Sequence, residues 1–250
     1  MSLQPELTRS TTPTELRYPI SPDTVLRRRK ALKRELLQQP KLLTVKIAIL
    51  GGSTTGDVRS MLELFLLAHG ISPSFYESAY NAYYEEVQFE HPDLWNFKPD
   101  IALLHTTWHN VSRFPDLLAS DSEVTDLLNN EVDRFERLWT KVHGSLGALI
   151  IQNNFDLPPL CPLGNLDTSA AFGRSRFLRR LNDAFATYAA GNSRLLINDI
   201  SYLCAQVGLA EWFDPSYWYN YHMAVSPRGA VLIGQNVASI IKSVYGGSKK

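Results

Sequence analysis

Short apolar segments alternate with helix-like segments along most of this chain, and this alternation constrains the fold more than any other feature. Most of the apolar segments read as strands that are buried on both faces of a sheet. Strands that alternate with helices predict an α/β fold with a mostly parallel five-stranded sheet and helices on both faces. The expected strands are 46–50, 74–76, 100–104, 148–152 and 194–198, and the expected helices are 57–69, 80–89, 122–142, 174–190, 201–207 and 226–244.

The composition argues against several classes of protein. Lys plus Arg and Asp plus Glu both number 25, so the formal net charge is zero, whereas a nucleic-acid-binding domain usually carries a basic excess. No apolar run reaches the roughly 20 residues that span a bilayer, and the N-terminus lacks the apolar core of a signal peptide. Cys161 and Cys204 are too few for a disulfide framework. We therefore expect a cytoplasmic protein that binds neither nucleic acid nor membrane.

The first 44 residues differ from the rest of the chain. Residues 1–21 are polar and without periodicity, which predicts an irregular arm, and residues 22–38 have the pattern of a basic helix. We expect residues 1–44 to pack as an arm and helix on one domain formed by residues 45–250. The run Arg27–Lys30 is either a solvated helix face or a surface for an acidic partner.

The turn at residues 51–56 (GGSTTG) is the sharpest local signal, because it joins the first expected strand to a helix. It places Ser53 at the carboxyl end of the strand, near the unpaired N–H groups of a helix N-terminus. This position suits a nucleophile whose attack creates an oxyanion, with Gly52 and Thr54 beside it. It also suits a phosphate site, although the turn matches neither a Walker A loop nor a dinucleotide-binding fingerprint. A Gly-rich turn without chemistry is the third interpretation.

A second polar segment follows the fourth expected strand, where Asn153 and Asn154 stand. Because the carboxyl ends of parallel strands share one edge of the sheet, we expect these amides to face the same crevice as Ser53. A carboxamide can donate a hydrogen bond to an oxyanion without carrying charge. The alternative is an Asn-rich turn before Pro158 and Pro159.

A third segment, the aromatic stretch 212–222, lies near the C-terminus. It ends in His222, a candidate general base, and contains Asp214, which could orient the imidazole. Alternatively, the histidine packs among the aromatic residues or lies on the surface. His105 and His109 have the spacing of a helical metal-binding pair, but no further ligand cluster accompanies them, so we expect no metal site.

Together, these three segments resemble the sequence blocks of the SGNH (GDSL-type) hydrolases. The turn 51–56 resembles the first block, with Gly52 where that family normally has Asp. Asn154, or else Asn153, takes the place of the Asn of the third block. His222, followed by a short loop, a glycine and a helix, resembles the last block.

This resemblance implies a three-layer α/β/α sandwich of the flavodoxin-like kind, with Ser53 as nucleophile and His222 as base. Two positions depart from the family pattern. Asn81 replaces the glycine of the second block, whose amide helps to form the oxyanion hole. Asp214 precedes His222 by eight positions, whereas the family's Asp and His form a DxxH block.

A longer resemblance covers the chain from about residue 25 to its end. The amino-terminal region of FkbH-like proteins is similar, in the same order, to the stretches LKRELLQQP, KIAILGGSTT, YESAYNAYYEEV, LWNFKPDIALL, IIQNNFDLPP, FLRRLNDAF and WFDPSYWY. The resemblance implies that such a domain precedes a haloacid-dehalogenase-type phosphatase domain (subfamily IIIC). A motif of the DLDNTLWGG kind typically follows a segment like SVYGGSKK, where this chain stops, so we expect the phosphatase domain to be absent from it.

FkbH-like proteins are associated with loading a glyceryl unit, from a phosphorylated glycerate donor, onto an acyl carrier protein. The resemblance therefore implies a biosynthetic acyltransferase or esterase-type domain. In it, Ser53 would transfer an acyl group, such as glyceryl, to or from a carrier-protein thiol or a hydroxyl acceptor, without a cofactor. The alternative is a catalytically degenerate module that docks a carrier protein or a substrate for the neighbouring phosphatase domain.

Overall fold

The computed structural model describes residues 12–41 and 43–246, so residues 1–11 of the expected arm lie outside the described residues. A five-stranded sheet with the order β2-β1-β3-β4-β5 forms its centre, and every neighbouring pair of strands is parallel. This order is the flavodoxin-like one, so the predicted α/β sandwich is confirmed, with a sheet that is wholly parallel. The strands are β1 (Leu43–Gly51), β2 (Ile71–Glu77), β3 (Ile101–His105), β4 (Leu149–Asn153) and β5 (Leu195–Asn198).

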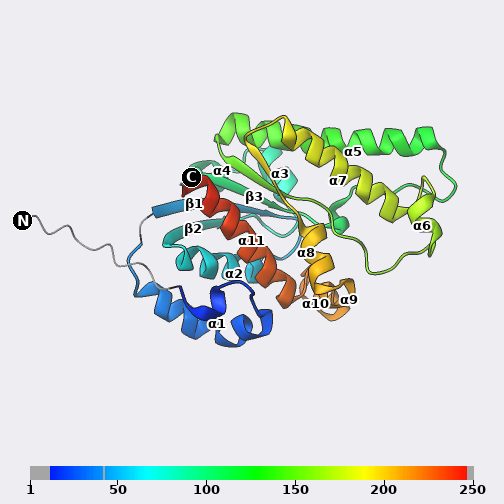
Figure 1. Cartoon of the computed structure of the whole chain (residues 1–250). Coiled ribbons are helices and arrows are strands. Elements are labelled where there is room, and N and C mark those ends of the chain that lie inside the picture. Colours follow the sequence, from blue (N-terminus) through cyan, green and yellow to red (C-terminus); the bar gives the residue numbers. More distant parts are fainter. Residues whose placement is uncertain (1–11, 42, 247–250) are drawn as a thin grey trace, which may run out of the picture.

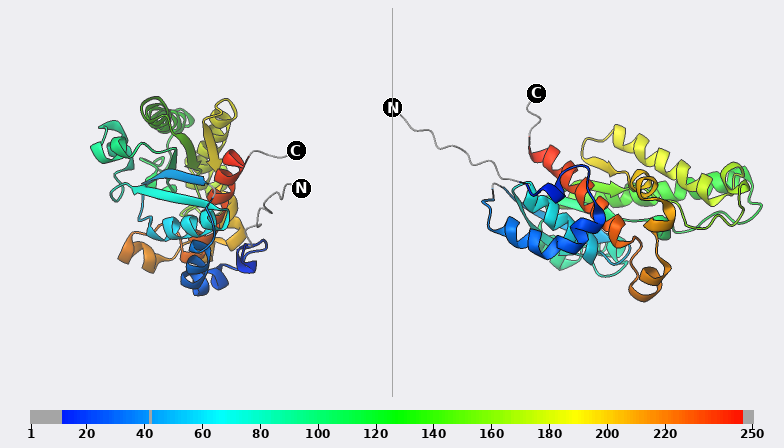
Figure 2. Two further views of the ribbon diagram at one scale, coloured as in Figure 1. Left: turned by 90° about the vertical axis from the view of Figure 1, so that its left-hand side faces the viewer. Right: turned by 60° about the horizontal axis from the view of Figure 1, so that its bottom comes forward.

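Helices cover both faces of this sheet (Figures 1 and 2). One face carries α1 (Pro22–Leu37), α2 (Gly56–Ala68), α8 (Ile200–Val207), α9 (Leu209–Trp212) and α11 (Pro227–Tyr245). The other face carries α3 (Tyr83–Gln88), α4 (Pro92–Phe97), α5 (Asp121–Lys141) and α7 (Arg174–Ala190). Two short helices, α6 (Leu166–Ser169) and α10 (Pro215–Tyr221), lie toward the carboxyl ends of the strands (Figure 1).

Side-chain alternation along the strands divides the core into two clusters. Ile47 and Ile49 of β1 belong to the cluster under α2 and α11, whereas Ala48 and Leu50 belong to the cluster under α5 and α7. Successive side chains of a strand point to opposite faces, and helices cover both, so the strand has no polar face. This is why β1, β3, β4 and β5 contain apolar runs, whereas the edge strand β2, which is mostly half-buried, also contains Ser72, Ser74 and Glu77.

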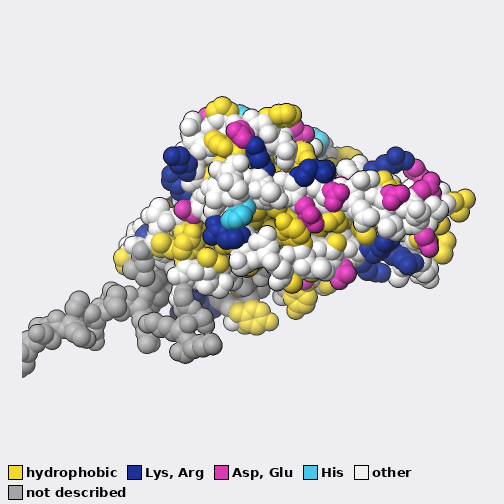
Figure 3. Space-filling view, turned by 90° about the horizontal axis from the view of Figure 1, so that it is seen from above, with side chains coloured by type: hydrophobic (Ala, Val, Ile, Leu, Met, Phe, Trp, Pro, Cys, Tyr) yellow, Lys and Arg dark blue, Asp and Glu magenta, His cyan; other side chains and the backbone are white. Residues whose placement is uncertain are grey.

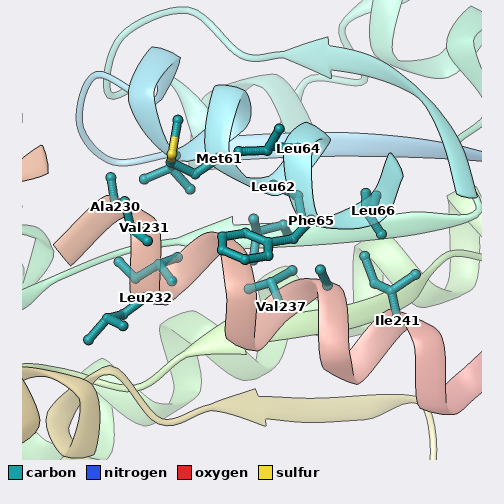
Figure 4. Close-up of a cluster of buried hydrophobic side chains, with 14 of the residues drawn as sticks. Met61, Leu62, Leu64, Phe65, Leu66, Ala230, Val231, Leu232, Val237 and Ile241 are labelled. Atoms are coloured by element: carbon teal, nitrogen blue, oxygen red, sulfur yellow. The ribbon is translucent and has the colours of Figure 1, made fainter. Parts of the chain in front are cut away.

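Helices α2 and α11 pack side by side (Figure 4). Phe65 of α2 and Val237 of α11 lie in the interface between them, and both are buried. Gly234 allows the close approach, because a Cβ atom there would lie 2.7 Å from the backbone nitrogen of Leu62. The packing positions the candidate site, since α2 follows the turn 51–56 directly and α11 follows the aromatic stretch.

The expected helices and strands are present, with ends that differ by at most three residues. The short helices α4, α6, α9 and α10 were not expected. In α10 the Asp214 carboxylate accepts a hydrogen bond from the Ser216 N–H (2.8 Å) and Pro215 occupies the first turn, so a local cap starts a helix too short to show periodicity. Three single-turn elements complete the chain, namely η1 (Thr14–Leu16), η2 (Trp108–Asn110) and η3 (Val142–Leu146).

Acidic and basic side chains are interspersed on the face drawn in Figure 3. None of the helices within residues 12–41 and 43–246 combines the length and apolar composition that a membrane crossing needs. Helix α1 packs on the domain through Val25, Leu32 and Leu36, which are fully buried. Its cations lie on the other side of the helix, where the side chains are half-buried or exposed.

Candidate active site

Ser53 lies in the turn between β1 and α2. Its side chain is only 2% exposed, and its Oγ atom has no hydrogen-bond partner within the described part of the chain. The preceding Gly52 N–H donates to the His105 carbonyl at the end of β3 (3.0 Å), which continues the β1–β3 ladder past the strand. A buried hydroxyl that is held in an ordered turn and makes no structural hydrogen bond is available to take part in a reaction.

The strands on either side of β1 determine which side chains come near Ser53. These are β2 and β3, so the segments that follow them border the turn. Asn110, after β3, donates from Nδ2 to the Gly52 carbonyl (2.9 Å) and to Asn81 Oδ1 (3.2 Å), and Asn81 follows β2. The family resemblance had assigned Asn81 to the position of the second-block glycine, whereas Asn110 was not among the predicted site residues. The strand order β2-β1-β3, expected for a flavodoxin-like sheet, is the signal that could have identified it.

Asn110 is held from several directions. Its Oδ1 accepts a hydrogen bond from the Thr107 N–H (2.9 Å) in a capping box. Its carbonyl accepts one from Arg134 Nη2 of α5 (2.8 Å), and Arg134 also pairs with Glu131 (2.7 Å). Glu131 is 2% exposed and accepts hydrogen bonds from the backbone and hydroxyl of Ser112. The Arg134–Glu131 ion pair on α5 thus holds the loop that carries Asn110 in place.

The space around Gly52 explains one departure from the SGNH pattern. A Cβ atom at Gly52 would lie 2.2 Å from Asn110 Nδ2, so any side chain there would displace the amide. Asn81 occupies the left-handed region (φ 54°), which glycine adopts freely and asparagine tolerates best among other residues. Its side chain is exposed at the mouth of the turn.

His222 ends α10 in a left-handed conformation (φ 53°). Its carbonyl accepts a hydrogen bond from the Thr54 N–H (2.9 Å), and Thr54 Oγ1 donates to the Tyr221 carbonyl (2.7 Å). The backbone of residue 222 therefore lies directly beside the residue that follows Ser53. The imidazole packs on Tyr80, with ring centroids 4.9 Å apart, and makes no hydrogen bond to Ser53 Oγ in the described structure.

Asp214 lies at the opposite end of α10 from His222. Its carboxylate accepts hydrogen bonds from the N–H (2.8 Å) and hydroxyl (2.6 Å) of Ser216, and these bonds lower the pKa of the carboxyl. The two ends of a seven-residue helix are about 10 Å apart, since each residue rises 1.5 Å. The contacts of Asp214 are those of a helix cap rather than of a group that orients the imidazole.

Asn153 and Asn154 make structural contacts one strand away from the turn. The Asn154 amide donates to Asp199 Oδ1 (2.7 Å) and its oxygen accepts from the Ser201 N–H (3.1 Å). Asn153 is fully buried, and its contacts lie with residues at the ends of the neighbouring strands. Asn153 is the last residue of β4 and Asn154 follows it. Strand β3 separates β4 from β1, and the hydrogen bonds of both amides are made to residues outside the turn.

A chain of buried amides runs under the strand ends. Asn236 of α11 donates to Asn198 (2.6 Å), Asn198 donates to Asn153 (2.7 Å), and Asn153 donates to His105 Nδ1 (2.9 Å). Because His105 accepts at Nδ1, its proton resides on Nε2. Burial lowers the pKa of His105 to about 4, so this histidine remains neutral inside the fold.

Acidification is expected to destabilise the fold between about pH 6.5 and 4. Burial lowers the pKa values of His69, His105 and His109 from 6.5 to about 4. The unfolded chain then takes up protons in this range while the folded chain does not, so the free energy of unfolding falls as the pH falls. For fully buried His105 the shift corresponds to at most about 3 kcal/mol. Asp156 offsets part of the loss, because burial raises its pKa to about 6.

Urea unfolding at about pH 7, 5.5 and 4.5 measures this slope. His105→Asn retains an acceptor for the Asn153 amide and removes one titrating group. The variant should be less stable at neutral pH, where the smaller side chain leaves a void, but its stability should fall less on acidification. An unchanged slope in the variant would contradict the neutral, buried state of His105.

A comparison with solved structures shows a substantial likeness to a protein that contains a phosphatase domain. The N-terminal part of the protein BF1531 from Bacteroides fragilis, which contains a phosphatase domain and was crystallised with Mg, matches with a TM-score of 0.72 and 19% identity. The match covers 87% of this chain and 56% of that chain, so this chain spans little more than half of that one.

Two weaker likenesses accompany it. TesA matches with a TM-score of 0.49, 12% identity and coverage of 80% of this chain and 99% of that chain. A GDSL-like lipase, BT0569 from Bacteroides thetaiotaomicron, matches with a TM-score of 0.44, 12% identity and coverage of 86% and 98%. No family model and no curated protein matches the sequence.

The class of protein is thus an α/β/α sandwich with a flavodoxin-like parallel sheet. It shares this fold with the N-terminal part of a protein that also contains a phosphatase domain. The resemblance to the amino-terminal region of FkbH-like proteins is confirmed at the level of the fold.

Proposed function

We propose that this chain is a serine-dependent acyltransferase or esterase-type domain in which Ser53 is the nucleophile. The observation that carries the proposal is the buried Ser53 hydroxyl, which has no hydrogen-bond partner among residues 12–41 and 43–246. Ser53 lies between Gly52, whose carbonyl accepts a hydrogen bond from the Asn110 amide, and Thr54, whose N–H donates to the His222 carbonyl. The Ser53 hydroxyl, the Asn110 carboxamide and the backbone of His222 thus come from three separate segments of the chain to one turn.

In the proposed reaction, Ser53 Oγ attacks the carbonyl carbon of an ester or thioester. The reaction requires the His222 ring to rotate away from Tyr80 until a ring nitrogen reaches the hydroxyl and takes its proton. The carbonyl oxygen gains the negative charge, which the Ser53 N–H and one Asn110 amide hydrogen stabilise. The imidazolium then protonates the leaving group, and a thiol, a hydroxyl or water accepts the acyl group in the second half of the reaction.

The contact between Asn110 and Asn81 supports this role for the amide. One amide hydrogen of Asn110 is committed to the Gly52 carbonyl, and the other meets Asn81 Oδ1 at 3.2 Å. Asn81 is exposed, so its carbonyl-type oxygen stands at the mouth of the turn as a substitute for a substrate oxygen. A substrate would displace this long contact and take the same hydrogen.

The charges near α2 favour an acyl substrate over a phosphate. Asp57 lies in the first turn of α2, and Thr55 Oγ1 donates to Glu77 (2.7 Å), which also pairs with Arg59 (3.0 Å). Carboxylates near a helix N-terminus already satisfy the positive end of the helix dipole. A phosphate there would meet like charge, whereas a neutral carbonyl would not.

The test is covalent labelling of the chain with a fluorophosphonate probe, followed by digestion and mass spectrometry. The proposal predicts one adduct, on the peptide that contains Ser53. An adduct on another residue, or no adduct on a chain that is folded by circular dichroism, would refute it. A panel of short-chain acyl esters and acyl thioesters then ranks the leaving groups.

A carrier-protein partner is the finer part of the proposal. Arg29, Lys30 and Lys33 of α1, with Asp57 and Ser60 of α2, line a groove of about 220 Å³. The groove borders the first turns of α2, immediately beyond the proposed nucleophile. Its basic side suits an acidic carrier protein, which would deliver a glyceryl or other acyl thioester to the turn. In this arrangement the phosphatase domain of the same protein would prepare the acyl donor.

Charge reversal tests this surface. The pair Arg29→Glu and Lys30→Glu is expected to weaken binding of an acidic acyl carrier protein by about tenfold or more at low salt, because the long-range attraction reverses. Arg137→Glu with Arg179→Glu, exposed residues on α5 and α7 across the sheet, is the matched control of equal charge. Equal weakening by both pairs, measured by calorimetry, would refute the groove as the docking surface. Carrier binding without Ser53 labelling would instead favour the degenerate module.

A further inference from the structure

Asp156 is a buried carboxylate that joins two segments of the chain. It follows β4 and is 1% exposed. One oxygen accepts a hydrogen bond from the Trp108 N–H (3.0 Å), and the other accepts one from the indole Nε1–H of Trp212 (2.8 Å). A buried carboxylate is costly to desolvate, and here two N–H groups from distant parts of the chain compensate it.

The first of these segments carries the Asn110 amide. Trp108 begins η2, and Asn110 ends it within the capping box that starts at Thr107. A fixed Trp108 N–H therefore fixes the start of the single turn whose last side chain reaches the Gly52 carbonyl. The ion pair on α5 holds the same turn from the other side.

The second segment carries His222. Trp212 ends α9 and is fully buried, and its carbonyl accepts a hydrogen bond from the Ser226 N–H (2.7 Å). This bond closes the base of the excursion 213–225, which includes α10 and His222. Gly229 lies so close to the indole that a Cβ atom there would be 3.1 Å from it. The buried Trp212 side chain therefore anchors the segment 213–225 to the core at the point where the two ends of that segment meet.

The two segments also meet at their tips. The His109 ring lies between Trp108 (3.8 Å between centroids) and Trp218 of α10 (3.7 Å). The contact of His109 with Trp108 and Trp218 is a stack of partly exposed rings, which can slide past each other. The contact through Asp156 consists instead of two directed hydrogen bonds in a buried environment. The two hydrogen bonds to Asp156 therefore determine the spacing between the segment that carries Asn110 and the segment that carries His222.

We propose that Asp156 is a positioning residue that sets the distance between the Asn110 amide and the His222 imidazole across Ser53. The inference rests on the proposed function, because it gives these three side chains their roles. Asp156 touches neither substrate nor nucleophile. It acts by fixing the roots of both segments, and a displacement of about 1 Å in such a site can cost up to about 10²-fold in rate.

The ionisation of Asp156 makes this positioning role measurable as a pH dependence. Burial raises the pKa of Asp156 to about 6, and a protonated carboxyl keeps only one acceptor for its two N–H donors. The titratable and charged groups on the elements around it are His109 beyond β3, Cys204 on α8 and Glu211 on α9. Glu211 is paired with Arg228 on the surface, and burial keeps Cys204 and His109 neutral across this range.

Asp156→Asn tests the proposal, because the carboxamide has nearly the same shape but offers only one acceptor oxygen. We expect it to slow fluorophosphonate labelling of Ser53 by about 10- to 100-fold at neutral or higher pH. The ratio of wild-type to variant rates should shrink as the pH falls through about 6, since wild-type Asp156 then loses the same acceptor.

Asp167→Asn is the matched control. Asp167 is also 1% exposed and accepts two N–H hydrogen bonds, from Arg174 (3.2 Å) and Ser175 (2.8 Å), but these lie at the start of α7. This variant should lose stability without a pH-dependent change in the labelling ratio. If Asp156→Asn does not fold, Trp212→Phe removes one donor and should slow labelling in the same pH-dependent way.

A second readout separates this inference from the proposed function. The indole N–H resonance of Trp212, assigned by its loss in Trp212→Phe, should titrate near pH 6 in the wild type and not in Asp156→Asn. A resonance that does not titrate, or equal labelling rates in wild type and Asp156→Asn, would overturn the inference. A wild-type chain that is never labelled, with a resonance that still titrates, would overturn the proposed function and leave the link between the segments supported.

Discussion

Ser53→Ala is expected to abolish acylation of this chain, a loss of about 10³-fold or more in the rate of labelling or ester turnover. The hydroxyl makes no hydrogen bond to any residue that the structure describes, so its removal breaks no hydrogen bond there. The variant should therefore retain the stability of the wild type. Stopped-time labelling with a fluorophosphonate and a thermal melt of the same samples measure both quantities.

Ser78→Ala is the control for this prediction. Ser78 lies after β2 at the same edge of the sheet, and its hydroxyl accepts a hydrogen bond from the Gly51 N–H (2.9 Å). Its loss should lower stability by about 1 kcal/mol and leave labelling close to the wild-type rate. If Ser53→Ala retained full turnover, the nucleophile would have to be sought elsewhere in the chain.

Asn110→Ala is expected to slow acylation of Ser53 by about 10²–10³-fold, which is the usual cost of one oxyanion donor. In the proposed reaction the amide supplies a hydrogen for the developing negative charge, and in the fold it holds the Gly52 carbonyl, so its loss should affect both the transition state and the turn. The decrease should appear in kcat more than in KM, because the oxyanion exists only in the transition state.

Asn154→Ala distinguishes between Asn110, the oxyanion donor proposed from the structure, and Asn154, the donor that the sequence suggested. Its amide bonds Asp199 and the Ser201 N–H at the start of α8, so we expect a loss of stability and a far smaller effect on labelling than for Asn110→Ala. The reverse order of the two variants would restore Asn154 as the oxyanion donor. Labelling rates at one pH, corrected for the folded fraction, decide between them.

Local patterns were sufficient to predict the elements of the sheet. The apolar run at 46–50 and the helical spacing at 57–69 depend only on which residues neighbour each other along the chain. The same holds for Ser53, because a strand, a Gly-rich turn and a helix in succession present the middle of the turn at the sheet edge.

Contacts between distant segments were harder to anticipate. Asp214 looked like a triad member, but a neighbouring serine and proline made it a helix cap. Asn110 stands five residues past β3 in a stretch rich in Thr, Trp and His, with nothing local to set it apart from Asn153 or Asn154.

The sequence alone determined the layered fold, the strand that precedes Ser53 and the approximate position of His222, because hydrophobic period and turn chemistry are short-range properties. The tertiary structure decided which carboxamide contacts the turn that holds that serine. Strand order places β3, and not β4, next to β1, so the loop after β3, and not the one after β4, borders the turn. It also decided the role of Asp156, because a carboxylate can join two indole-bearing segments only after folding has brought both to the same buried place.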